Sequence, residues 1–140
     1  FKPYKFNNDT YQRLLFKLTD SIKNKKKITL NIIKTKGNII YPSRDFLDVF
    51  DLTNLIIKIL LKLKNSNIRA AFNVGNGKHI CINQLINQFE KVTKKKINYA
   101  QKILPKEEIN FTLANILLIK KTFNWKPIIT LRKSILSHLQ

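Results

Sequence analysis

Cys81 and the two histidines are the side chains whose types could carry nucleophilic or metal chemistry. Cys81 stands at the start of an expected helix, whose N-terminus would lower a thiol pKa, but only His79 lies near it in the sequence. His79 and His138 are far apart, and no second ligand stands at metal-binding spacing beside either. We therefore favour a structural or helix-capping role for Cys81 over catalysis, and we expect no metal site.

Loops that bind a dinucleotide or a phosphate need several glycines at fixed offsets. The glycines of this chain, Gly37, Gly75 and Gly77, fit neither the G-x-G-x-x-G pattern nor a Walker loop. No tyrosine is followed four residues later by a lysine. The chain by itself therefore holds no self-sufficient active site.

Basic residues outnumber acidic ones by 27 to 8, for a formal net charge of +19. Such a charge is typical of proteins that bind nucleic acid or an anionic surface. Only four of the basic residues are arginine, however, and the lysines are spread among isoleucines and asparagines, whose codons are also rich in A and T. We therefore attribute the charge first to genome composition. A basic binding protein for nucleic acid or an acidic partner is the alternative.

The 140 residues suffice for one ordinary domain, and 44% of them are hydrophobic. A single cysteine rules out an internal disulfide and fits a reducing, cytoplasmic location. Lysines interrupt the longest apolar run, so we expect no membrane insertion. The chain contains no methionine and begins on Phe1, which predicts a fragment of a longer protein. A non-functional gene remnant is a further interpretation.

Apolar residues at helical spacing predict helices over 10–23, 52–63, 82–92, 116–123 and 131–139. The expected N-caps are Thr10 or Asp9, Asp51, Asn115 and Thr130. The second helix should turn an apolar face inward and lysines outward. Its expected apolar face comprises Leu52, Leu55, Ile56, Ile59, Leu60 and Leu63, and its solvated side Lys58, Lys62 and Lys64.

β-Branched and apolar runs predict strands over 28–33, 39–41, 46–49, 70–74 and 97–99. The first two should form a hairpin through Lys36-Gly37-Asn38. The run 70–74 looks buried and ends in Gly75-Asn76-Gly77, where the backbone can adopt positive φ. Because strands alternate with helices and no linker divides the chain, the predicted class is α/β in a single unit.

Three blocks follow one another along the sequence: SRDFLDVFDL (43–52), FNVGNGKHICINQLI (72–86) and LPKEEINFTLANILLIKKTFNWKP (104–127). They resemble, in order, motifs from the C-terminal part of the extended short-chain dehydrogenase/reductases of the NAD-dependent epimerase/dehydratase group, which includes UDP-glucose 4-epimerase. The family motifs are R-D-[FY]-[ILV]-x-V-x-D-[LV], [FY]-N-[LIV]-G-x-G, and P-R-P-G-D with a closing G-W-x-P. Order and spacing make the match specific over about residues 10–140.

The resemblance implies an α/β fold that is the C-terminal portion of a Rossmann-like enzyme, including its small substrate-binding lobe. Residues 1–140 would form one substrate-binding part. The N-terminal half, with the glycine-rich loop and the catalytic Tyr-x-x-x-Lys pair, would lie upstream and bind NAD or NADP. Family members move a hydride between a sugar and this cofactor, with the tyrosine as acid/base.

The resemblance also implies a function. We expect the parent protein to be an NAD-dependent epimerase or dehydratase of nucleoside-diphosphate sugars, serving polysaccharide or lipopolysaccharide synthesis. A homodimeric parent is compatible with it, and the isolated chain should be inactive.

The resemblance assigns substrate contacts to residues of the first and third blocks. Arg44 matches the family arginine that contacts the diphosphate, and a planar guanidinium offers parallel donors to phosphate oxygens. The alternative for Arg44 is a surface ion pair with Asp45 or Asp48. Lys106 stands where the family usually has arginine and could neutralise a phosphate, while Glu108 could accept from a ribose hydroxyl. No catalytic or cofactor-binding residue is assigned in this chain.

The other residues of the blocks are assigned to structure. We interpret Asp45 as an orienting or structural partner and Asp51 as a helix cap, and we assign Asp48 no role. Trp125 should pack in a core. The hairpin before Arg44 is longer than the common pattern, and it either shapes the sugar pocket or decorates the edge.

Overall fold

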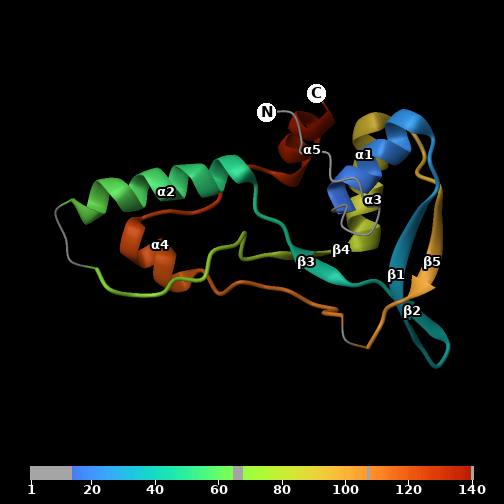
Figure 1. The fold of residues 1–140 in the computed structure, drawn as a ribbon, viewed down its shortest axis with the longest axis horizontal. Coiled ribbons are helices and arrows are strands. Elements are labelled where there is room, and N and C mark those ends of the chain that lie inside the picture. Colours follow the sequence, from blue (N-terminus) through green and yellow to red (C-terminus); the bar gives the residue numbers. More distant parts are fainter. Residues whose placement is uncertain (1–13, 65–67, 107, 140) are drawn as a thin grey trace.

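Two groups of elements lie at opposite ends of the molecule, and extended chain joins them (Figure 1). The computed structural model describes residues 14–64, 68–106 and 108–139. We call one group the core lobe: α1 (Leu14–Asn24), β1 (Ile28–Thr35), β2 (Asn38–Ile40), α3 (Ile82–Thr93), β5 (Tyr99–Ile103) and α5 (Leu131–Leu139). We call the other the arm: α2 (Val49–Leu63) and α4 (Leu117–Phe123). Between them lie β3 (Ser43–Asp45) and β4 (His79–Cys81), and the α/β class is confirmed.

The sheet of the core lobe has β1 at its centre. β1 pairs antiparallel with β2, and Thr35 lies opposite Asn38, so the predicted hairpin is confirmed with a turn at Lys36 and Gly37. Gly37 has a φ of 85°, a conformation that favours glycine. β1 also pairs in parallel with β5, from Ile28 opposite Tyr99 to Ile32 opposite Ile103. The predicted strand 97–99 therefore overlaps β5 only at its last residue.

A large hydrophobic core fills the core lobe between this sheet and its helices. Alternate residues of β1 point inward, as Ile28 and Leu30 do, because successive strand side chains face opposite sides. The predicted inner faces of the helices over 10–23 and 82–92 are confirmed within the described residues. The buried members of the core are Leu18, Ile22, Ile28, Leu30, Ile82, Leu85, Ile86, Phe89, Ile97 and Ile135.

The arm has a much smaller core, in which Leu55 of α2 meets Ile119, Phe123 and Trp125. Trp125 is 4% exposed, which confirms its packing role. Phe72 meets Phe123 edge to face, with ring centroids 5.3 Å apart. This small core covers only one side of α2.

The opposite side of α2 is apolar and exposed. Its side chains are between 37% and 65% exposed, and they are Val49, Phe50, Leu52, Ile56, Ile57, Leu60, Leu61 and Leu63. Lys58 and Lys62 are exposed, as predicted, and they donate to the carbonyls of Asn124 and Thr122 at the end of α4. The predicted inner position is confirmed for Leu55, which is buried, and for Ile59, which is partly buried, but it is wrong for Leu52, Ile56, Leu60 and Leu63. The apolar face of α2 is wide, and the small core of the arm covers only its Leu55 edge.

Two predicted strands differ from the structure. The strand expected at 46–49 lies instead at 43–45, because the chain already enters α2 at Val49. The run 70–74 is extended but belongs to no strand, since no other described segment pairs with it.

Two of the residues predicted as helix caps accept backbone N–H groups at helix starts. Thr130 Oγ1 accepts from Lys133 N–H at 3.3 Å, which confirms the cap of α5. Asn115 Oδ1 accepts from Leu117 N–H at 3.1 Å at the start of α4. The expected caps Asp9 and Thr10 lie outside the described residues. None of the helices in the described ranges is long and apolar enough to cross a membrane.

Candidate functional site

The three sequence blocks meet at β3, a strand of only three residues. On one side it pairs antiparallel with β4 of the second block, with Arg44 opposite Ile80. On the other side Ser43 forms a parallel bridge with Phe111 of the third block. Ser43 N–H donates to the Asn110 carbonyl at 3.0 Å, and Thr112 N–H donates to the Ser43 carbonyl at 3.2 Å. Blocks that are far apart in sequence thus share one strand.

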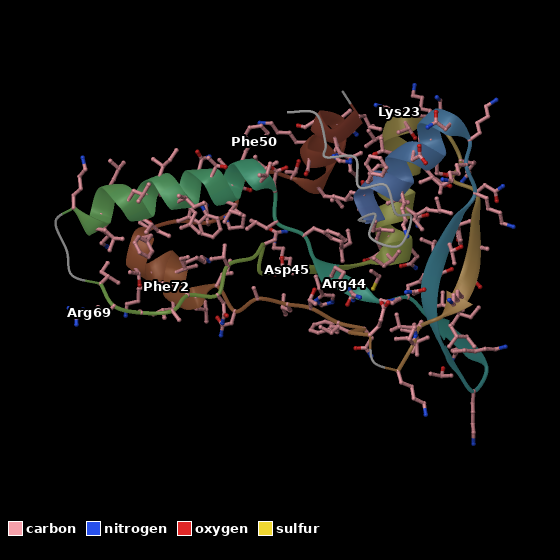
Figure 2. The ribbon with its side chains drawn as sticks, in the orientation of Figure 1. Lys23, Arg44, Asp45, Phe50, Arg69 and Phe72 are labelled. Carbon is pink, nitrogen blue, oxygen red and sulfur yellow. The ribbon has the colours of Figure 1, made fainter. Side chains whose placement is uncertain are left out.

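Arg44 projects from the middle of β3 and is half-buried (Figure 2). Its Nη1 donates to the Ser43 carbonyl at 2.9 Å, and its Nη2 donates to the Ile109 carbonyl. These bonds leave Nε–H and the second N–H of each terminal nitrogen for an anion. Arg44 forms no ion pair with Asp45 or Asp48, so the alternative of a surface ion pair is not what the structure contains.

Glu108 and Lys106 lie in the turn that leads to the Ile109 carbonyl. The turn is closed by Glu108 N–H, which donates to the Pro105 carbonyl at 3.1 Å. Asn31 of β1 donates through Nδ2 to Glu108 Oε2 at 3.4 Å. Both predicted side chains are exposed. The structure therefore brings Glu108 beside the carbonyl that holds Arg44, with Lys106 in the same turn.

Asp45 joins the second and third blocks through its carboxylate. Oδ1 accepts from Asn76 N–H at 2.6 Å, and Oδ2 accepts from Gly77 N–H at 3.1 Å and from Ala114 N–H at 3.0 Å. The predicted structural role of Asp45 is confirmed, but the sequence did not predict that its partners are these three backbone amides. Because the N–H groups of Asn76 and Gly77 already donate to Asp45, this turn does not offer them to a phosphate.

No family model and no curated protein matches the sequence. Solved structures do match it. UDP-glucose 4-epimerase from Stenotrophomonas maltophila, with bound NAD and formylated UDP-arabinopyranose, is 17% identical, with a TM-score of 0.82 over 94% of this chain and 40% of that one. UDP-glucose 4-epimerase from Brucella ovis, in complex with NAD, is 16% identical, with a TM-score of 0.79 over 91% and 40%. UDP-N-acetylglucosamine 4-epimerase from Methanobrevibacter ruminantium M1, in complex with UDP-N-acetylmuramic acid, is 23% identical, with a TM-score of 0.74 over 96% and 42%.

The chain therefore has the fold of the C-terminal part of these epimerase structures. The resemblance seen in the sequence is thereby confirmed at the level of the fold. The chain spans 40% to 42% of the length of these solved structures. In this epimerase-type fold, the three blocks that carried the resemblance are the segments that converge on β3.

The helix that follows β3 in the epimerase-type fold begins differently from the prediction. Its N-cap is Asp48, whose Oδ1 accepts from Phe50 N–H at 2.9 Å. Asp51 is 1% exposed, and its carboxylate accepts from Ile128 N–H and Ile129 N–H at 3.1 and 3.0 Å. The prediction that Asp51 caps the helix is therefore wrong, and Asp48, which was assigned no role, is the cap. Asp51 instead ties the start of the arm to the chain that enters α5.

Cys81 is the N-cap residue of α3, as predicted for a capping position. Its backbone N–H donates to Gln84 Oε1 at 3.1 Å, which is one half of a capping box. The neighbouring His79 ring lies 5.0 Å from the Phe111 ring. In the epimerase-type fold, this histidine packs across the junction of the second and third blocks.

A cavity of about 250 Å³ lies on the side of β4 that faces α5, and Arg44 does not line it. Its polar lining includes Asp48, Asn76, Lys78, His79 and His138. Burial, helped by the nearby charge of Lys23, lowers the pKa of His138 below its ordinary value. The cavity therefore lies between the core lobe and the segments around β3 and β4, and none of Arg44, Lys106 and Glu108 lines it.

Proposed function

We propose that this chain is the nucleotide-sugar-binding C-terminal part of an NAD-dependent epimerase or dehydratase that acts on nucleoside-diphosphate sugars, in polysaccharide or lipopolysaccharide synthesis. One observation carries the proposal: the Arg44 guanidinium is held by two backbone carbonyls where the three blocks meet, with N–H groups left for an anion. The epimerase-type fold supports it, since similar folds were solved with UDP and UDP-sugars.

The candidate side chains suit a nucleoside diphosphate. Arg44 would donate to the phosphate oxygens, and Lys106 would add a positive charge without fixed geometry. Glu108 would accept from a ribose hydroxyl through the carboxylate oxygen that Asn31 does not occupy. The exposure of Lys106 and Glu108 leaves both side chains accessible to a ligand.

The residues of this chain do not form a binding site for the nicotinamide cofactor. The chain has too few glycines for a dinucleotide loop, and the N–H groups of Asn76 and Gly77 donate to Asp45. We assign the cofactor, NAD or NADP, and the catalytic tyrosine to an upstream half of the parent protein. The exposed apolar side of α2 is the surface that would pack against that half, because contiguous exposed apolar side chains mark a contact surface.

Calorimetric titration with UDP-glucose tests the substrate proposal. Arg44→Ala should weaken binding by on the order of 1.5 to 3 kcal/mol, the usual contribution of a charged hydrogen-bond donor. Arg69→Ala is the matched control, because Arg69 is exposed at the far end of the arm (Figure 2). Unchanged affinity in Arg44→Ala, or an equal loss in both variants, would contradict a diphosphate contact by Arg44.

A further inference from the structure

We propose that Asp45 is a positioning residue for Arg44: it fixes the segment whose carbonyl orients the guanidinium. This inference rests on the proposed function, in which Arg44 binds the diphosphate. It adds that the negative charge next to Arg44 in sequence aids anion binding, although repulsion of a phosphate would be the simple expectation.

The Asp45 carboxylate is committed to backbone amides. It accepts N–H groups from Asn76 and Gly77 of one extended segment and from Ala114 of another. A carboxylate is acceptor-only, so both oxygens can serve such donors, whereas an asparagine would turn an NH₂ group toward some of them. Gly75 allows this close approach, since a Cβ there would lie 2.7 Å from Asp45 Oδ2 and 2.5 Å from Ala114 Cβ.

A continuous ladder leads from this carboxylate to the guanidinium. Asp45 N–H donates to Thr112 Oγ1 at 3.0 Å, and the backbone bonds of Ser43 with Thr112 and Asn110 follow. The next carbonyl along that segment is Ile109, which accepts from Arg44 Nη2. Ala114 and Thr112 are thus fixed by Asp45 at one end, and Ile109 holds Arg44 at the other.

The same hydrogen bonds reduce the repulsion expected between the Asp45 carboxylate and a bound phosphate. The amides that converge on Asp45 satisfy its charge locally, and no ion pair joins it to Arg44. The guanidinium therefore keeps its charge for an external anion, while the carboxylate sets where the guanidinium lies. Loss of the carboxylate should release residues 109–114 from β3 and so weaken diphosphate binding with Arg44 still present.

The first experiment is a double-mutant cycle on binding to UDP-glucose, with uridine as the probe that lacks phosphate. Asp45→Asn should weaken UDP-glucose binding about tenfold and leave uridine binding unchanged. In the Arg44→Ala background it should add almost nothing. Asp48→Asn is the matched control, because it removes a nearby carboxylate and keeps a good helix cap. Additive losses, or an equal loss for uridine, would overturn the positioning role.

The second experiment needs no ligand, so it separates this inference from the proposed function. ¹⁵N relaxation of the Arg44 side chain should show a more mobile guanidinium in Asp45→Asn than in the wild type or in Asp48→Asn. If Asp45→Asn does not fold, Thr112→Val is the second variant, because it removes the acceptor of Asp45 N–H in the same ladder. Thr112→Val should weaken UDP-glucose binding about threefold. An unchanged guanidinium in a folded variant overturns the proposal, whereas absence of UDP-glucose binding by the wild type overturns only the proposed function.

Discussion

The core lobe and the arm are built from similar residues but differ in how far those residues are buried. In the core lobe, helices on the sheet bury Leu18, Leu85 and Phe89 completely. In the arm, α2 is at least as apolar, yet of its apolar side chains only Leu55 is fully buried. The core lobe therefore covers its own apolar side chains, whereas the arm leaves most of the apolar side chains of α2 exposed.

The two regions also differ in what connects them to the candidate site. The third block runs from the sheet of the core lobe, past Arg44, into α4 of the arm. Asp51 makes a second connection, from α2 to the chain entering α5. The candidate site therefore lies where a region with a large hydrophobic core meets a region with a small one.

The largest expected effect is on the core lobe. Phe89→Ala should lower the free energy of unfolding by about 3 to 5 kcal/mol, because it leaves a cavity in a close-packed core. Phe50→Ala is the matched change in the arm, and it should alter stability by less than about 0.5 kcal/mol, since Phe50 is 60% exposed (Figure 2). Urea unfolding followed by circular dichroism measures both. Similar losses in the two variants would show that the outer side of α2 is covered in solution.

A smaller effect is expected at the connection between the regions. Asp51→Ala should lower stability by about 2 kcal/mol, because it removes a buried carboxylate that accepts from the part-buried amides of Ile128 and Ile129. Asp48→Ala removes only the cap of α2 and should lower stability by about 1 kcal/mol. The same urea titration ranks the two variants. The reverse order would restore Asp51 to the capping role predicted from the sequence.

The sequence predicted the core lobe better than the arm for a physical reason. Apolar periodicity over 82–92 has one inner face, and residues 28–33 alternate, so each pattern specifies which side chains turn inward. In α2 the apolar residues form a wide face, and only the part of it at Leu55 and Ile59 meets the small core of the arm, which periodicity alone does not reveal. The run 70–74 was predicted to be a buried strand from its composition, but no described segment pairs with it, and only Phe72 packs against the small core of the arm.

The substrate contacts of Arg44, Lys106 and Glu108 stay predictions that rest on the resemblance of the blocks. The structure adds a network that the sequence did not predict, in which Arg44 donates to the Ile109 carbonyl next to Glu108. The carboxylate contacts of Asp45 are to backbone amides far along the chain, which carry no residue-type signal. Asp48 and Asp51 stand one turn apart at a helix start, where either could cap, so the choice depended on the chain that packs against them.

A third perturbation concerns acid stability of the core lobe. The Lys96 side chain and the Ile97 N–H, both bonded to its carboxylate, hold the pKa of Glu90 below its ordinary value of 4.5. Folding stability from this group is therefore present above pH 4.5 and is lost as pH falls through the lower folded pKa. Glu90→Gln should flatten the stability curve below pH 4.5, whereas Glu108→Gln should not. An unchanged slope in Glu90→Gln would show that the bonds contribute nothing in solution.

The smallest effect on stability is expected where the arm is exposed. Leu60→Lys with Leu61→Lys replaces side chains that are 61% and 62% exposed, so the free energy of unfolding should change by less than about 0.5 kcal/mol. Self-association, measured by sedimentation, should nevertheless fall sharply, because exposed apolar patches of this kind drive association. Leu136→Lys, at a 44% exposed position of α5, is the control and should leave association unchanged. If Leu136→Lys lowers self-association as much as the double variant does, the apolar side of α2 is not a distinct contact surface. The arm and the core lobe would then differ only in how tightly their side chains are packed.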